Sequence, residues 1–152
     1  MKVRKSLKID KQYVIGTVGR LTEAKNQKFL IDLFADIHKK NAETILLIVG
    51  DGELRGVLEQ QVKNLGLSDY VIFTGNKSNT QDYYQAMDVF VFPSLWGGLG
   101  ISSLYIHFRA YIIQPYKIFT HLYYLPNNYK NFVSIVLHNL YHTLLSLMLL
   151  PD

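Results

Sequence analysis

The chain has 152 residues, of which 49% are hydrophobic and 18% are charged, a composition that suits one globular domain and excludes a disordered or low-complexity chain. No cysteine is present, which excludes a disulfide framework and a thiolate metal site. The net charge of +4 is compatible with several classes of partner, so the placement of the charges matters more than their sum.

The chain begins with a polar segment that contains the basic residues Lys2, Arg4, Lys5 and Lys8. Because no apolar run accompanies them, this segment does not have the pattern of a secretory signal. We therefore expect a cytoplasmic protein. Nucleic acid is not among its expected partners.

Four short apolar runs alternate with longer amphipathic stretches between residues 13 and 93. This alternation is typical of a parallel sheet with crossover helices. Each run is nearly continuous in apolar residues, as in strands that are buried on both faces. The sequence therefore predicts an α/β fold, a Rossmann-like parallel sheet with crossover helices, whose strands are residues 13–18, 44–49, 71–73 and 89–92.

Three helices are predicted between these strands. Apolar residues recur at helical spacing from 29 to 37, and acidic and basic residues occupy the opposite face. A second predicted helix covers residues 53–65, with Gly66 as its C-terminal stop. A shorter third helix is expected at residues 81–87, before the last strand.

The first strand ends in a loop that contains Gly19, Arg20 and Lys25. Arginine presents a planar fork of donors to phosphate oxygens and lysine adds a mobile charge, so this loop suits a diphosphate at the carboxyl end of a parallel sheet. On spacing alone, the simpler interpretation is a solvated loop in which Gly19 serves a turn. Gly16 and Gly19 do not form the GxGxxG fingerprint of dinucleotide-binding folds.

Two further glycine-rich segments follow strands. The segment Gly50-Asp51-Gly52 is interpreted as a sharp turn in which Asp51 caps the next helix, although a backbone contact to a ligand stays open. Residues 97–100, Gly-Gly-Leu-Gly, precede an expected helix, whose free N–H groups can hold phosphate. A flexible connection is the alternative for this last segment.

Motifs for metal-dependent or hydrolytic chemistry are missing from the sequence of the α/β part. No Asp-x-Asp pair is present, and the histidines lack metal spacing, so we expect neither a metal nor a cofactor. The only histidine in the sequence of the α/β part is His38, which is predicted on the outer side of a helix. No Ser-His-Asp arrangement, as in hydrolases, accompanies it.

The composition changes near residue 101. Residues 89–151 contain no Asp or Glu, whereas the first 88 residues contain eleven of the twelve, and neither helical nor strand periodicity organises the later part. Residues 133–150 approach the roughly 20 apolar residues of a membrane span. Since His138, Asn139 and His142 interrupt them, we favour a buried or misfolded hydrophobic tail.

Three segments together resemble consecutive blocks of the group 1, or family 4, glycosyltransferases: VIGTVGRLTEAKNQKFLIDLF, LLIVGDGELRGVLEQQVKNLGLSDYVIFTGN and YYQAMDVFVFPSLWGGLG. Their order and spacing fit the family, which is more specific than any single glycine motif. The resemblance implies the C-terminal, nucleotide-sugar-binding lobe of a GT-B fold over residues 1–101. Residues 102–152 form a second, non-matching segment, for which an out-of-frame origin is our hypothesis.

The resemblance also implies roles for individual residues. Arg20 and Lys25, with Gly19, correspond to positions that contact the donor diphosphate. Residues around Thr74, Gly75 and Asn76 correspond to the loop that holds the nucleotide base. The last glycine loop approaches the donor phosphate and sugar, and its matching residues are Gly98, Leu99 and Gly100.

The chain departs from the family at the pattern E-G-x-G-x-x-x-x-E, whose glutamates engage the donor sugar and the ribose. Gly97 and Tyr105 stand in their places. An acceptor-binding lobe, which precedes this region in the family, is also missing from the sequence. We therefore expect weaker donor binding and an inactive chain, and no catalytic residue is identified.

Intact members transfer a sugar from a nucleotide-diphosphate-sugar to a sugar or lipid-linked acceptor, with retention at the anomeric carbon, in polysaccharide or glycan biosynthesis. The resemblance implies the same donor here, without a metal, and peripheral association with the inner face of a membrane. A non-catalytic nucleotide-binding module and a small membrane-attached protein are the alternatives.

Overall fold

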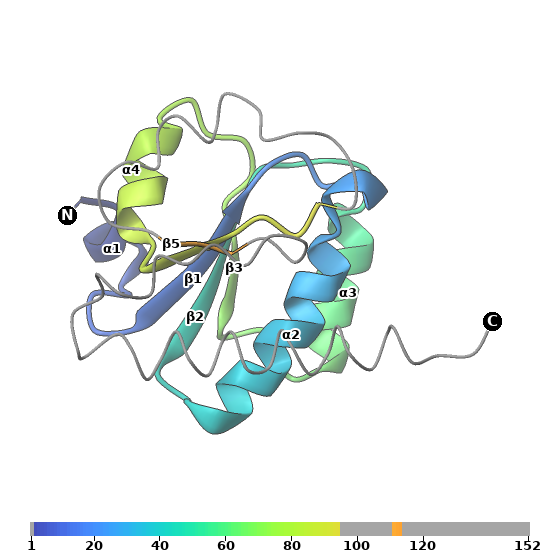
Figure 1. The fold of residues 1–152 in the computed structure, drawn as a ribbon, viewed down its shortest axis with the longest axis horizontal. Helices are drawn as coiled ribbons and strands as arrows, with labels where there is room; N and C mark the ends of the chain where they lie inside the picture. The colour runs from blue at the N-terminus through green and yellow to red at the C-terminus, as the bar shows by residue number, and fades with distance from the viewer. Residues whose placement is uncertain (1, 95–110, 114–152) are drawn as a thin grey trace.

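The computed structural model describes residues 2–94 and 111–113, which form an α/β unit (Figure 1). Its helices, in chain order, are α1 (Lys2–Leu7), the short 3₁₀ helix η1 (Glu23–Lys25), α2 (Gln27–Lys40), α3 (Arg55–Asn64) and α4 (Thr80–Ala86). Its strands are β1 (Tyr13–Val18), β2 (Thr44–Val49), β3 (Val71–Phe73), β4 (Val89–Val91) and β5 (Tyr111–Ile113).

Within the described residues, the strands form a five-stranded sheet in the order β3-β2-β1-β4-β5. Every neighbouring pair is parallel; Ile15 of β1, for example, is in register with Leu46 of β2 and Val89 of β4. Parallel neighbours need a crossover connection, and α2, α3 and α4 supply the connections between β1 and β4. The predicted α/β fold with a parallel sheet is confirmed.

Helices cover both faces of this sheet, with α2 and α3 on one face and α1 and α4 on the other (Figure 1). Alternate residues of each strand point to opposite faces. Ile15 of β1 therefore packs in the same cluster as Phe34 of α2, whereas the preceding Val14 packs with Val3 of α1 and Tyr84 of α4. Burial on both faces explains why the strands are continuous apolar runs rather than alternating ones.

Helix α1 was not predicted from the sequence, because its six residues, three of them basic, show no helical periodicity. Tertiary contacts hold it in place. Val3 is buried, and the guanidinium of Arg4 pairs with the carboxylate of Asp88, just before β4. Asp88 also accepts a hydrogen bond from the Val14 N–H, at 2.8 Å, so this carboxylate connects α1, β1 and β4.

Several boundaries differ from the prediction. The strand predicted at 89–92 ends at Val91, and the helix predicted from residue 53 begins at Arg55, because residues 53–54 form a turn. Gly66 follows α3 at φ +70°, as expected for a C-terminal stop.

Strand β5 lies in a region where the sequence shows no strand pattern, yet it pairs in parallel with β4. The predicted domain boundary at residue 101 stays a prediction, and the apolar stretch 133–150 lies outside the described residues. No helix in the described part has the length and hydropathy to cross a bilayer.

Candidate functional site

The strand order creates a topological switch point between β1 and β4. From β1 the sheet extends through β2 to β3 on one side and through β4 to β5 on the other. Ligands of open α/β sheets bind outside the carboxyl ends of the strands at such a point. The loop that carries Gly19, Arg20 and Lys25 follows β1, and the segment from Phe92 to Ser94 follows β4, so these two segments flank the switch point.

The loops after β1, β2 and β3 are joined by main-chain hydrogen bonds that continue the sheet beyond the strands. These bonds run from Gly19 N–H to Val49 C=O (2.9 Å), Leu21 N–H to Asp51 C=O (3.0 Å), Gly50 N–H to Gly75 C=O (3.0 Å) and Thr74 N–H to Ile48 C=O (3.0 Å). Each loop is thereby fixed relative to the next, so the loops at the carboxyl edge of the sheet form a rigid surface.

Two glycines make this close approach of the loops possible. A Cβ atom at Gly50 would overlap the carbonyl oxygen of Gly19, and one at Gly52 would overlap that of Leu21. Gly50 also has φ +136°, a conformation that other residues rarely adopt. By contrast, Gly16 lies inside β1 against the side chain of Met87, so its role is packing rather than ligand binding.

Arg20 has a fixed main chain and an exposed side chain. Its carbonyl oxygen accepts a hydrogen bond of 3.0 Å from Nε2 of Gln27, a side chain that is only 2% exposed. The guanidinium lies 3.9 Å from the carboxylate of Glu53 and is 76% exposed. Arg20 lines a pocket of about 400 Å³ together with Asp51, Gly52 and Asn76.

Lys25 lies on the side of the loop that faces β4. Its aliphatic stem passes Gly19, where a Cβ atom would be 3.8 Å from the Lys25 Cδ. Its ammonium lies 5.1 Å from the centre of the Phe92 ring. The next residue, Asn26, adopts φ 54° and donates from Nδ2 to the carbonyl oxygen of Pro93, at 3.3 Å. The β1 loop and the β4 loop are thus in contact.

The loop after β3 reaches the same pocket. The hydroxyl of Thr74 donates to the carbonyl oxygen of Gly75, at 3.0 Å, and Asn76 lines the pocket beside Arg20. The structure therefore places Arg20 and Asn76 at one pocket, with Gly19 preceding Arg20 in the β1 loop, and the ligand-binding roles of these residues stay predictions. Three further predicted donor-site residues, Gly98, Leu99 and Gly100, lie outside the described residues, as do Gly97 and Tyr105.

Asp51 was wrongly predicted to cap the helix after β2. The helix begins four residues later, at Arg55, so Asp51 is too early in the chain to bind its first N–H groups. The carboxylate instead accepts from the Gly52 N–H (2.8 Å) and pairs with Nη1 of Arg55 (3.2 Å). A hydrogen bond to Glu59, more than the nearby Asp51, raises the pKa of Arg55 above its usual value.

Sequence reasoning assigned Asp51 and Gly52 to a turn and left a backbone contact to a ligand open, but it missed that the Asp51 side chain contributes to a pocket. Their position at the end of β2 was the available signal, because carboxyl ends of parallel strands meet at one edge of the sheet. The predicted glycine turn is present, and it contributes a carboxylate to the site as well.

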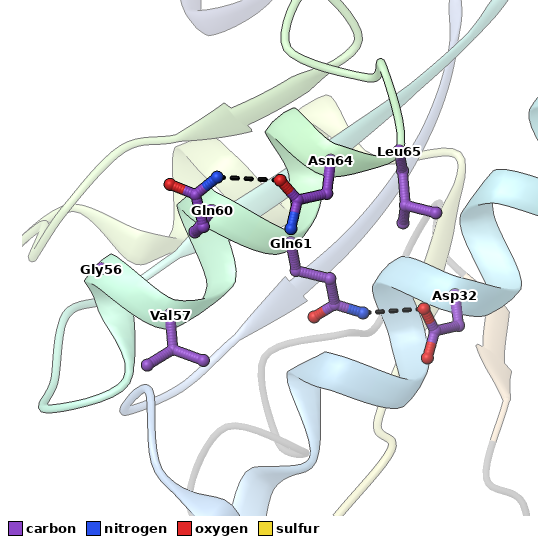
Figure 2. A pocket seen from close by; sticks show the side chains of 7 residues that line it. All are labelled: Asp32, Gly56, Val57, Gln60, Gln61, Asn64 and Leu65. Atoms are coloured by element: carbon purple, nitrogen blue, oxygen red, sulfur yellow. Dashed lines mark hydrogen bonds between the residues drawn. The ribbon is translucent and has the colours of Figure 1, made fainter.

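A larger hollow of about 560 Å³ lies between α2 and α3 (Figure 2). The amide of Gln61 donates to Asp32 of α2 across it, at 2.7 Å, and the exposed Val57 lines it. Its lining contains a carboxylate and no cation, so it does not suit a diphosphate. Within residues 2–94 and 111–113, no group of three His, Asp or Glu residues is arranged to hold a metal.

Residues 2–104 match the family of glycosyl transferases group 1. The chain is 39% identical over 87 residues to the uncharacterized glycosyltransferase MJ1059 of Methanocaldococcus jannaschii, a match that covers 57% of this chain and 21% of that protein. The chain spans between a fifth and a quarter of the length of this protein and of other curated relatives that it matches.

Solved structures of similar fold include two of glycosyltransferases from other organisms. HepE of Anabaena, in complex with UDP and glucose, is 26% identical with a TM-score of 0.62, over 69% of this chain and 29% of that one. The C-terminal domain of the group 1 glycosyl transferase LpcC of Francisella tularensis is 25% identical with a TM-score of 0.66, over 74% of this chain and 63% of that one.

Proposed function

Because this chain belongs to the group 1 glycosyl transferases, we propose that it binds the diphosphate of a nucleotide-sugar donor at the carboxyl ends of β1 to β4. One observation carries this proposal: Arg20 and Asn76 line one pocket beyond the carboxyl ends of β1 to β3, and Lys25 lies on the side of the same β1 loop that faces β4. The planar guanidinium of Arg20 and the mobile ammonium of Lys25 suit a diphosphate.

The proposed chemistry is transfer of the donor sugar to an acceptor with retention at the anomeric carbon, as the family resemblance implies. As the bond to the sugar breaks, negative charge develops on the departing diphosphate. Arg20 and Lys25 stabilise this charge more strongly in the transition state than in the bound substrate, because more negative charge is present there. This is an electrostatic contribution to catalysis. The last glycine loop, at Gly98 to Gly100, is proposed to approach the donor phosphate and sugar.

We propose UDP as the nucleotide part of the donor. The support is HepE, which was solved with UDP and glucose and shares 26% identity over 69% of this chain. Thr74, Gly75 and Asn76 are the proposed contacts to the base. The sequence contains no Asp-x-Asp pair, so binding is proposed not to require a divalent metal.

A non-catalytic nucleotide-binding module is the second candidate. Gly97 and Tyr105 are the observation that favours it, because neither side chain supplies the carboxylate that orients the donor in the family. Such a module binds UDP without turning over a UDP-sugar. Measuring both binding and transfer therefore separates the two candidates.

The acceptor is proposed to be a sugar or a lipid-linked sugar, reached from the cytoplasm at the inner face of a membrane. The apolar stretch 133–150 supports such peripheral association. Co-sedimentation of the full chain with vesicles that contain anionic lipid tests this part. Recovery of all the protein in the supernatant, at low and at physiological salt, contradicts it.

Calorimetric titration of the full chain with UDP, with and without EDTA, tests the proposed donor site. Arg20→Ala is expected to weaken UDP binding by about 10- to 100-fold, because a charge-assisted hydrogen bond is lost. Lys63→Ala, at an exposed position on α3, is the matched control, since it removes the same charge outside the pocket. If both variants bind UDP as the natural chain does, the proposed site is wrong.

A further inference from the structure

The ammonium of Lys25 has an aromatic partner and, within the described residues, no carboxylate within ion-pairing distance. It lies 5.1 Å from the centre of the Phe92 ring, inside the range of about 6 Å for a cation–π interaction. Arg20, the other cation of the loop, lies beside the carboxylate of Glu53. The two cations are therefore held by different kinds of partner.

The Phe92 ring is fixed by the core on the α1 and α4 side of the sheet. It is 8% exposed and belongs to the cluster that contains Tyr84 and Phe90. Its centre lies 6.4 Å from that of Phe90, whose ring is in edge contact with Tyr84 at 5.3 Å. A ring packed in this way presents a fixed surface to the lysine.

Two further contacts hold Lys25 and the Phe92 ring beside each other. The hydrogen bond from Asn26 to the Pro93 carbonyl connects the residue after Lys25 with the residue after Phe92. The lysine stem passes Gly19, where any larger side chain would lie against it. Lys25 and Phe92 are 67 residues apart in the sequence, so this contact depends on β1 and β4 being neighbours in the sheet.

We propose that Phe92 is a positioning residue, which holds the Lys25 ammonium at the switch point in the orientation that receives the donor diphosphate. This inference rests on the proposed function. A carboxylate partner would fix the ammonium but would also neutralise its charge, whereas an aromatic ring attracts the cation and leaves its charge available to an anion. Positioning in advance also reduces the entropy that a flexible lysine loses on binding.

The test compares UDP binding by Phe92→Leu and Phe92→Tyr in the full chain. Phe92→Leu keeps an apolar side chain but removes the ring, and we expect about three- to tenfold weaker binding. Phe92→Tyr keeps the ring, and its affinity should stay within about twofold of the natural chain. Urea denaturation of both variants establishes that each is folded at the temperature of the titration.

A double-mutant cycle with Lys25→Ala distinguishes positioning from a general structural role. Without the ammonium, Phe92→Leu should have no further effect on UDP affinity, because there is no charge left to position. An equal loss in the natural and the Lys25→Ala backgrounds would overturn the inference, as would an unchanged or increased affinity of Phe92→Leu in the natural background.

A measurement without ligand keeps this inference distinguishable from the proposed function. The NMR signals of the Lys25 Cε protons should be shifted upfield by the ring in the natural chain and in Phe92→Tyr, but not in Phe92→Leu. If the shift is present and UDP does not bind, the proposed function is wrong while the lysine–ring contact stands. If the natural chain and Phe92→Leu give the same lysine signals, the inference is wrong even where UDP binds.

Discussion

Replacing Gly50 by alanine should destabilise the protein more than the same replacement of Gly52, Gly56 or Gly66. Gly50 connects β2 to the pocket loop, has φ +136°, and lies against the carbonyl group of Gly19. Alanine introduces two separate problems, a disfavoured backbone conformation and an overlap with main-chain atoms of Gly19.

The magnitude follows from these two terms. Holding an ordinary residue in a region reserved for glycine costs about 1–3 kcal/mol. Separating the β1 and β2 loops to relieve the overlap weakens the hydrogen bonds from Gly19 to Val49 and from Leu21 to Asp51, at about 1 kcal/mol each. We therefore expect the free energy of unfolding to fall by about 3–5 kcal/mol, a large part of the 5–15 kcal/mol typical of a domain.

Three other glycines serve as controls: Gly66 and Gly52 each isolate one of the two terms, and Gly56 has neither. Gly66 has φ +70° but no atom near its Cβ position, so Gly66→Ala should cost only about 1–2 kcal/mol. Gly52→Ala carries the overlap with Leu21 without the positive φ and should lie between these values. Gly56, in α3, has free space at its Cβ position, and alanine there should stabilise by about 0.5–1 kcal/mol.

Urea denaturation followed by circular dichroism measures all four variants against the natural chain. The expected order of stability is Gly56→Ala, the natural chain, Gly66→Ala, Gly52→Ala and Gly50→Ala. A Gly50→Ala chain as stable as Gly66→Ala would refute the reasoning, since it would mean that the two loops are not in the close contact described. UDP titration of the folded fraction should also show weaker binding, because Arg20 follows the displaced Gly19.

Other expectations concern charges. Arg4→Met should lower the free energy of unfolding by about 1–3 kcal/mol, because it leaves the mostly buried carboxylate of Asp88 without its cation; a change below about 0.5 kcal/mol in urea denaturation would contradict this. Glu53→Gln should increase UDP affinity by no more than about threefold, since it removes an exposed carboxylate beside Arg20. That gain should disappear in 1 M salt, where the Debye length is about 3 Å, and calorimetry at two salt concentrations checks both statements.

The fold could be predicted because local pattern and tertiary environment agree in this chain. Strands β1 and β2 are buried on both faces, so their sequences are continuous apolar runs, and the predicted boundaries 13–18 and 44–49 match the structure. The family resemblance was likewise carried by consecutive residues, and the match over residues 2–104 confirms it. Helix α1 was missed because Arg4 is held by Asp88, a contact that no local pattern shows.

The site was predictable only in part. Arg20, Lys25 and Asn76 could be named from the sequence, since each follows a strand in a block that the family shares. The sequence could not show that Asp51 lines a pocket with Arg20 rather than capping a helix. That difference depends on α3 beginning at Arg55, which follows from how the β2 loop packs on the β1 loop.

The sequence by itself determined the α/β class, the positions of the buried strands and the two cations of the β1 loop, because apolar periodicity and charge are properties of neighbouring residues. The tertiary structure alone decided which of these residues meet. Lys25 and Phe92 are in contact because β4 pairs with β1 on the side opposite β2. Strand order is set by the packing of the helices on both faces of the sheet, and a contact across the switch point has no signature in either segment on its own.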